Sequence, residues 1–423
     1  MSGTNITTEN NNAIGIHAMA GGSITATDVN VTTMGSAAHG LAAVNGGTVI
    51  ASGTAVAVDG AGSAAIDLAG SAPGTVSFTG GSLSATNAAI ILAEGGIGTV
   101  SINGNTAISP ALVNGQLLLA KVTENTVGTP SNLTLNIDRI ASLTGDIVVD
   151  PSTLTYNLSN SQWTGHLVLT GPGNTVSASL NTSQWTGDLL VDAGNNADVS
   201  LAQDSLWTGL AQNATDITID ASSIWNITGD SNATDIVANA GLIQFLPRPE
   251  AYSTLTVGSY TGSAGSRIGF NTYLGADGSP SNLLVINGGQ ASGTTSVLIN
   301  NTGGSGAQTV ADGIMLVQVT NGGTTTTDAF TLGQRVAAGA YEYQLFAAAA
   351  PMRTIGSSGP ILSTHRQALR RKNRILRSTV QKWRSMRRFL QLRGKWDLPP
   401  WARCMSAWAR RKTCEACRSH GPM

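Results

Sequence analysis

The chain has 423 residues, of which 51 are glycine, 11% are charged and 5% are aromatic. Its formal net charge of -1 hides two opposite parts, because residues 1–350 hold five basic and 22 acidic side chains and residues 351–423 hold 18 basic and two acidic ones. The composition excludes a coiled coil and a collagen. The hydrophobic share of 41% argues against disorder, and no run reaches the roughly 18 apolar residues of a membrane helix.

Short strands separated by turns are predicted from the start of the chain. The first residues, Met1–Asn5, lack the basic and apolar regions of a secretory signal, so we expect any export signal to lie upstream of this sequence. Runs in which β-branched and small residues alternate then recur roughly every 25 residues, where Gly, Asn, Asp and Ser mark the turns. These runs are Gly22–Thr27, Gly47–Ala51, Gly74–Phe78 and Gly98–Asn103.

A pentapeptide repeat follows in the middle of the chain. Ser-Gln-Trp-Thr-Gly occurs at 161–165 and 183–187, and variants of it occur at 205–209 and 223–225. The repeated tryptophans are Trp163, Trp185, Trp207 and Trp225. A period near 20 residues with three strand-sized pieces predicts one coil of a parallel β-helix, in which each coil pairs with the coils on either side of it. An antiparallel β-sandwich is the alternative that short strands also allow.

The four tryptophans have two interpretations. Aromatic side chains at equal positions of successive coils stack on one another inside a solenoid, and this structural role is the one we predict. An exposed aromatic stripe that stacks on sugars is the alternative. The segment 245–250 contains two prolines, breaks the repeat and is taken as the end of the regular coils.

The repeat, together with the segment from Leu255 to Phe346, resembles the pertactin-type passenger domains of type V autotransporters, which Gram-negative bacteria export. The resemblance is strongest in a cap motif at the C-terminal end of such passengers. Its residues are Leu274, Gly275, Asp277, Ser279, Pro280, Asp312, Gly313, Gly339, Tyr341 and Tyr343. Ala276 departs from the family, which usually has Asp or another polar residue there.

The resemblance implies an all-β fold and a domain order. We expect a right-handed parallel β-helix of the pectin-lyase-like kind at 1–245 and an autochaperone-type cap at 246–346. In the family a short helix-forming linker and a β-barrel translocator follow, which place the passenger at the cell surface or release it. We expect neither linker nor barrel in residues 347–423.

The basic tail at 347–423 is predicted to have no native fold. Back-translation of three of its segments, read one base earlier, permits strings that resemble the family's sequence after the cap, in the family's order. We therefore expect a frame slip between Phe346 and Thr354. Two other interpretations of the tail are a basic helix at 366–393 for nucleic acid or an anionic membrane, and a zinc site. The zinc site would use Cys404, Cys414, Cys417 and His420, and we predict no metal site and no cofactor.

Enzymatic interpretations find little support in the sequence. A polysaccharide lyase needs a basic residue close to Asp-bound Ca²⁺, yet the five basic residues of 1–350 are far apart in sequence. The segment Gly229-Asp230-Ser231 is similar to the nucleophile motif of exported serine proteases, but His17, His39 and His166 are isolated along the chain.

We predict a surface-displayed, non-enzymatic passenger for adhesion or host interaction, with unknown partners on a host surface or in extracellular matrix. No nucleic acid is expected to bind residues 1–346, because they are acidic, and no small-molecule substrate is expected. The alternatives are a secreted β-helix carbohydrate-active enzyme and a short protein with a basic nucleic-acid-binding tail.

Overall fold

A computed structural model describes residues 1–249, 251–347 and 360–363. The chain divides into two compact units, Met1–Thr364 and His365–Met423, and the second unit lies outside the described residues. Strands are the only regular elements in the described part, which contains no helix. No described segment therefore forms a helix that is long and apolar enough to cross a membrane.

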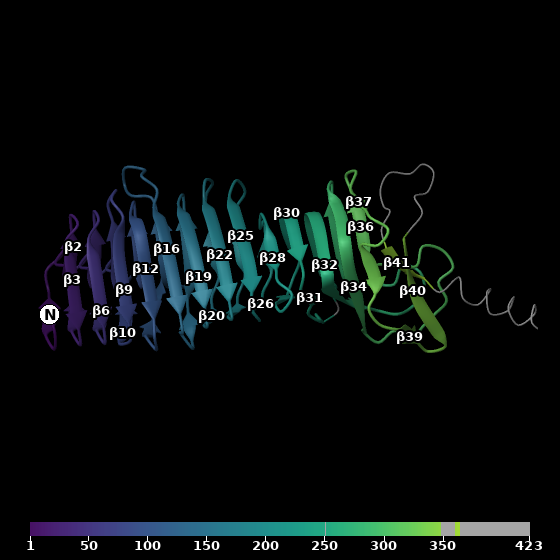
Figure 1. Cartoon of the computed structure of the whole chain (residues 1–423), viewed down its shortest axis with the longest axis horizontal. Coiled ribbons are helices and arrows are strands. Elements are labelled where there is room, and N and C mark those ends of the chain that lie inside the picture. The colour runs from purple at the N-terminus through teal and green to yellow at the C-terminus, as the bar shows by residue number, and fades with distance from the viewer. Residues whose placement is uncertain (250, 348–359, 364–423) are drawn as a thin grey trace, which may run out of the picture. The chain divides into compact units, whose positions relative to one another are not determined.

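The first unit is a parallel β-solenoid in which successive coils are stacked in chain order (Figure 1). Each regular coil contributes strands to three faces, and the strands of successive coils pair in parallel on each face. The alternating apolar residues of each strand point into the coil, where they meet their counterparts from the neighbouring coils.

Face 1 runs through most of the solenoid. Its strands are β3 (Ser23–Thr27), β6 (Thr48–Ser52), β9 (Gly74–Thr79), β12 (Ile97–Asn103), β16 (Asn132–Asp138), β19 (Thr153–Ser159), β22 (Thr175–Asn181), β25 (Asn196–Ala202) and β28 (Ile217–Ile219).

Face 2 begins with a separate sheet of β1 (Asn5–Thr8), β4 (Asn30–Thr33), β7 (Ala55–Val58), β10 (Ser82–Ala85) and β13 (Ala107–Ser109). It continues with β17 (Leu143–Thr144), β20 (Gln162–Thr164), β23 (Gln184–Thr186), β26 (Leu206–Thr208), β29 (Ile224–Ile227) and β31 (Leu242–Phe245).

Face 3 consists of β2 (Ile16–Met19), β5 (Leu41–Val44), β8 (Ile66–Ala69), β11 (Ile91–Glu94), β15 (Gln116–Thr123), β18 (Asp146–Asp150), β21 (Leu167–Leu169), β24 (Leu189–Val191) and β27 (Ala211–Gln212). The two-residue strand β14 (Leu112–Val113) forms an antiparallel hairpin with β15.

Longer strands carry the solenoid to its C-terminal end. They are β30 (Ser231–Asn239), β32 (Thr254–Thr272), β33 (Leu283–Asn287), β34 (Gln290–Asn301), β36 (Val317–Thr320), β37 (Thr324–Thr325) and β38 (Phe330–Leu332). A four-stranded antiparallel sheet follows, made of β35 (Ile314–Met315), β41 (Pro360–Ser363), β40 (Tyr341–Ala347) and β39 (Val336–Ala338).

One core ladder of face 1 changes character near the C-terminal end. The inward residues at this position are apolar in every coil from Ala26 to Ile219. The residue at the same position of the following coil is Asn239. The buried Asn239 side chain donates hydrogen bonds to the Tyr260 hydroxyl (3.0 Å) and to the Arg267 carbonyl oxygen (3.1 Å). The solenoid interior thus becomes partly polar where the longer strands begin.

The predicted parallel β-helix is confirmed, and the antiparallel β-sandwich is wrong, because the strands of successive coils pair in parallel. Parallel pairing continues across the two prolines near 247–249, since Ile243 of β31 is in register with Ile268 of β32. The coils are therefore not interrupted at residue 246. The domain boundary there stays a prediction. Strand β41 lies inside the predicted foldless tail, and the rest of that tail lies outside the described residues.

Candidate functional site

One coil is much longer than its neighbours. Residues that hydrogen-bond between β12 and β16 are 35 positions apart in the sequence, whereas those between β16 and β19 are 21 apart. The extra residues of this coil form two insertions: one at 110–115, between β13 and β15, and one at 124–131, between β15 and β16. Insertions into single coils of a solenoid form loops on its surface, and such loops often carry the binding site.

The first insertion is built around the β14–β15 hairpin. Its turn residues Asn114 and Gly115 have φ angles of 52° and 84°, the left-handed conformation that a two-residue hairpin turn requires. The second insertion is organised by Asn125, whose side-chain oxygen accepts hydrogen bonds from the backbone N–H groups of Val127 (3.1 Å) and Thr129 (3.0 Å). Both insertions are therefore ordered by their own local contacts.

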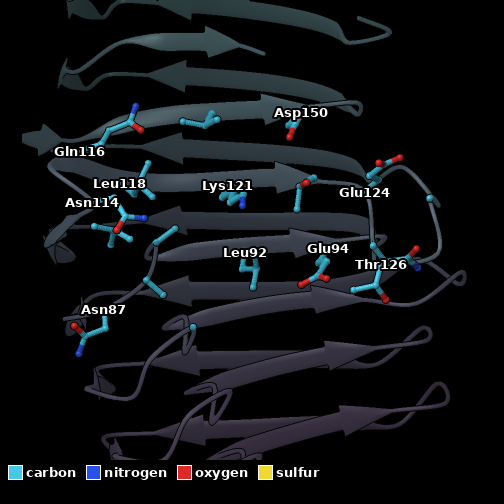
Figure 2. A pocket seen from close by; sticks show the side chains of 18 residues that line it. Asn87, Leu92, Glu94, Asn114, Gln116, Leu118, Lys121, Glu124, Thr126 and Asp150 are labelled. Atoms are coloured by element: carbon cyan, nitrogen blue, oxygen red, sulfur yellow. The ribbon is translucent and has the colours of Figure 1, made fainter. Parts of the chain in front are cut away.

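A cleft of about 790 Å³ lies on face 3 between these insertions. Figure 2 shows the amides Asn87, Asn114 and Gln116 towards one end of it and Glu94 and Glu124 towards the other. Its floor is formed by outward side chains of β11, β15 and β18, the strands that the long coil brings together with its neighbours.

Four charged side chains line the cleft: Glu94, Lys121, Glu124 and Asp150. Glu94 and Asp150 are both in register with Thr123, one in the coil before and one in the coil after, so each is a diagonal neighbour of Lys121. Strand spacings place such diagonal Cα atoms roughly 8 Å apart. Within the described part of the chain, none of the four side chains forms an ion pair or hydrogen bond, which leaves them available to a ligand.

A buried acid lies beside the cleft in the same row of face 3. Asp67 is in register with Leu92, which lines the cleft, and is only 7% exposed. Burial raises the pKa of the Asp67 carboxyl above its usual range; His39 and His17 oppose this rise, whereas Glu94 adds to it.

Each insertion carries an exposed apolar side chain next to a residue that lines the cleft. Leu112 in the hairpin is 68% exposed and Val127 in the second insertion is 82% exposed. Large apolar side chains held outward at the rim of a cleft are positions where a macromolecular partner gains buried area.

The predicted tryptophan repeat lies inside the solenoid, on face 2. Trp163, Trp185, Trp207 and Trp225 are at most 1% exposed and form a stack, here called the tryptophan ladder, with ring centroids 4.7–5.0 Å apart. Each indole Nε1 donates a hydrogen bond to a glycine carbonyl oxygen of the preceding coil. Buried in this way, the ladder cannot present its rings to a sugar, so the exposed aromatic stripe is ruled out.

The other residues of the pentapeptide have equally structural positions. The backbone N–H groups of the first three repeat serines each donate to the side-chain oxygen of the serine one coil later, as from Ser161 to Ser183 and from Ser183 to Ser205, both at 3.2 Å. A Cβ at Gly187 or Gly209 would collide with the glycine carbonyl of the preceding coil, so the last position of the motif requires glycine.

The cap motif residues come together around Asp277. Its carboxylate accepts hydrogen bonds from the backbone N–H groups of Val310 (2.8 Å), Ala311 (3.0 Å) and Gly313 (2.6 Å). Slight burial acts to raise the pKa of Asp277, but these hydrogen bonds outweigh it, so the pKa lies below its usual range. Asp312, between two of the donors, is exposed and lines a shallow surface depression with Asp277.

The remaining cap residues surround the same loop. The buried Tyr343 hydroxyl donates to the Gly275 carbonyl oxygen (2.9 Å) and accepts from the Ala307 N–H (3.0 Å). Four more cap positions are backbone or packing positions: Leu274 is buried, Ser279 donates to Ala276, Pro280 accepts from Tyr273, and Gly339 has a φ of 54°. Tyr341 is 37% exposed.

The residues considered for catalysis are not brought together. Ser231 is buried and its hydroxyl donates to the Gly229 carbonyl oxygen, while Asp230 accepts from the Thr254 N–H. His39 and His166 accept hydrogen bonds from backbone N–H groups of the following coil. The described part contains no group of three or more His, Cys, Asp or Glu side chains that could hold a metal ion. The cysteines and His420 lie outside the described residues.

The sequence patterns did not predict the cleft. Two signals could have indicated it: Asn114-Gly115, the strongest short signal for a hairpin, and the lengthening of one period relative to its neighbours. Neither insertion repeats elsewhere in the chain, so a search for self-similarity does not find them.

Comparisons with known proteins agree with this architecture. Residues 231–345 match the family model of Autochaperone Domain Type 1, which begins before the predicted cap boundary. A search of curated protein sequences gave no match. The crystal structure of the autotransporter UpaB from E. coli strain CFT073 is similar with a TM-score of 0.50 and 15% sequence identity, over 85% of this chain and 98% of that chain.

The crystal structure of the Haemophilus influenzae Hap adhesin is also similar, with a TM-score of 0.26 and 13% identity over 85% of this chain and 48% of that chain. The UpaB likeness shows a shared fold, and the family match gives the identity of the C-terminal coils. Together they support the pertactin-like autotransporter passenger that the sequence predicts: a β-helix whose residues 231–345 match a type 1 autochaperone domain.

Proposed function

We propose that this chain is a surface-displayed, non-enzymatic passenger whose cleft binds a macromolecule of a host surface or of extracellular matrix. The observation that carries the proposal is the cleft itself: a coil of 35 residues between shorter neighbours borders it, and its charged lining is unpaired within the described residues. A passenger of this family is displayed or released by its β-barrel translocator, which we take as the partner in an intact family member.

Apolar contacts at the cleft rim supply the test. The full chain is immobilised and its binding to cultured host cells and to purified matrix proteins is measured, with Leu112→Ser and Val127→Ser combined in one variant. Both side chains are exposed, so the variant is expected to fold normally and to bind at least about tenfold more weakly, which corresponds to about 1.4 kcal/mol.

A matched control removes an exposed apolar side chain elsewhere. Ile50 lies on face 1 and is 45% exposed, so Ile50→Ser is expected to bind as the unchanged chain does. Equal loss in both variants, or no loss in either, would show that the cleft is not the binding site. A rise in unsaturated-uronate absorbance on incubation with pectin or alginate would instead reveal a lyase and contradict the non-enzymatic part of the proposal.

A further inference from the structure

The outward rows of the solenoid differ sharply between faces. On face 1, the outward row from Ser101 to Ser200 is polar in every coil, and three of its members are linked by hydrogen bonds: Asn157 donates to Asn136 (2.8 Å) and Asn136 to Ser101 (3.1 Å). This row offers a partner no apolar surface.

Face 3 has a different row in the same coils. In successive coils the residues in register are Leu92, Lys121, Val148, Val168 and Leu190. The apolar members are half-buried, so part of each side chain remains exposed. The row starts in the cleft and leaves it at Val148, so the cleft and the apolar row form one continuous surface.

Acidic side chains follow this row. Glu94 and Asp150 lie at the C-terminal ends of β11 and β18, and Asp192 directly follows β24. Glu124 adds a carboxylate from the second insertion, and Lys121 is the one basic residue in the cleft lining. The acidic excess of residues 1–350 gives the surrounding field the same sign. Charge complementarity therefore requires a cationic partner, because a polyanion would meet unpaired carboxylates.

The spacing of the row favours an extended chain. Four coil-to-coil steps separate Leu92 from Leu190, which is roughly 19 Å at about 4.8 Å per step. About six residues of extended polypeptide cover that length. Such a segment can alternate between apolar side chains that pack on the row and basic side chains that reach the carboxylates.

From this geometry we propose that face 3, from the cleft to Leu190, docks an extended basic polypeptide segment that contains apolar residues at intervals. The inference rests on the proposed function and names the chemistry of the partner. The row Val148, Val168 and Leu190 takes the apolar side chains, and Glu94, Glu124 and Asp150 take lysine or arginine side chains.

The experiment measures fluorescence anisotropy of a short labelled peptide in which lysine and valine alternate, titrated with the full chain. The variant Glu94→Gln, Glu124→Gln, Asp150→Asn is expected to bind at least about tenfold more weakly, since exposed charge contacts each contribute modestly and add up. Lys121→Gln is expected to strengthen binding, because it removes the like charge. Raising the salt concentration should weaken binding by the unchanged chain.

The control variant makes the same change in charge away from the cleft. It combines Glu9→Gln, Asp204→Asn and Asp328→Asn, three exposed acids that line no part of the cleft. Equal weakening by the two triple variants would overturn the proposal, because general attraction to an acidic protein would then explain the binding. A peptide with glutamate in place of lysine must fail to bind, and its binding would also overturn the proposal.

A peptide with serine in place of valine separates the apolar contribution, and its weaker binding is expected. A glycan partner would give a different result: uncharged oligosaccharides would bind the unchanged chain and the cleft variant equally well, and the lysine–valine peptide would not bind. That result would refute a polypeptide partner. If the peptide binds as predicted while the Leu112→Ser, Val127→Ser variant still attaches to host cells, the proposed function fails and the docking chemistry stands. If that variant no longer attaches to host cells but no basic peptide binds the unchanged chain, the proposed function stands and the docking chemistry fails.

Discussion

The indole Nε1 of Trp185 donates a hydrogen bond of 2.8 Å to the carbonyl oxygen of Gly165, which belongs to the preceding coil. This bond ties the large side chain of one pentapeptide to the backbone of the one before it. The same relationship recurs for Trp207 and Gly187 at 2.9 Å. Stacking and hydrogen bonding therefore act together between the same pairs of coils.

Replacing Trp185 by alanine tests this coupling. The indole lies between Trp163 and Trp207, with ring centroids 5.0 and 4.7 Å away, so its removal leaves a large cavity. We expect a loss of about 3–5 kcal/mol in the free energy of unfolding. Hydrogen exchange should rise mainly in the adjoining coils, because a coil of a solenoid contacts only its neighbours. The exposed neighbour Gln184 provides the control, and Gln184→Ala should change stability by less than about 0.5 kcal/mol.

Gly187→Ala tests the requirement for glycine in the motif. Its φ is 152°, and an added Cβ would collide with the Gly165 carbonyl oxygen, which is itself the acceptor for Trp185. We expect a loss of about 2 kcal/mol or more, measured by urea unfolding. Gly229→Ala is the comparison, since its Cβ would meet only the flexible end of Leu210 at 3.1 Å. Equal losses in the two variants would contradict the steric argument.

Two buried tyrosines predict opposite effects of losing a hydroxyl. The Tyr156 hydroxyl is buried without a hydrogen-bond partner, whereas the Tyr260 hydroxyl is bonded to Asn239 and Thr295, both at 3.0 Å. Tyr156→Phe should stabilise the chain by up to about 1 kcal/mol and Tyr260→Phe should destabilise it by about 1–3 kcal/mol. Urea midpoints measure both. Destabilisation by Tyr156→Phe would show that its hydroxyl binds a water molecule.

The Asp277 carboxylate should make the free energy of unfolding depend on pH. Because its pKa in the folded chain lies below the unfolded value near 3.9, its contribution is fully present above about pH 4 and is lost as the pH falls through the folded pKa. Asp277→Asn should therefore lower the free energy of unfolding by about 1 kcal/mol at neutral pH. The difference between the variant and the unchanged chain should disappear in acid. Asp328, exposed and outside any described hydrogen bond, gives the control Asp328→Asn. A gap that persists unchanged at pH 2.5 would contradict the assignment.

The tryptophan spacing was enough to predict the coils, because side chains at equal positions of a parallel solenoid must lie in register. The cap motif likewise marked residues such as Asp277 and Tyr343 that hold one loop together. The contact partners of these residues were not predictable, since Asp277 reaches Val310 across 33 positions of irregular sequence.

The candidate site was not predictable by the same means. Glu94, Lys121 and Asp150 are spread over 57 positions with unequal spacing, and only the pairing of β11, β15 and β18 places them together. The bulge between Leu118 and Ala120 in β15 also shifts the register with β18, and no repeat in the sequence predicts this bulge. Periodicity reveals what is the same in each coil, whereas a binding site depends on what differs.

The long coil has a consequence for how such a protein changes over time. The pairing of β12 with β16 and of β16 with β19 keeps its alignment although one connection is far longer than the other. Doubling the length of a flexible connection costs only about 0.6 kcal/mol in closure entropy. The segments 110–115 and 124–131 can therefore be exchanged, lengthened or diversified by mutation while the stacked coils stay as they are, so that partner choice evolves separately from the ability to fold.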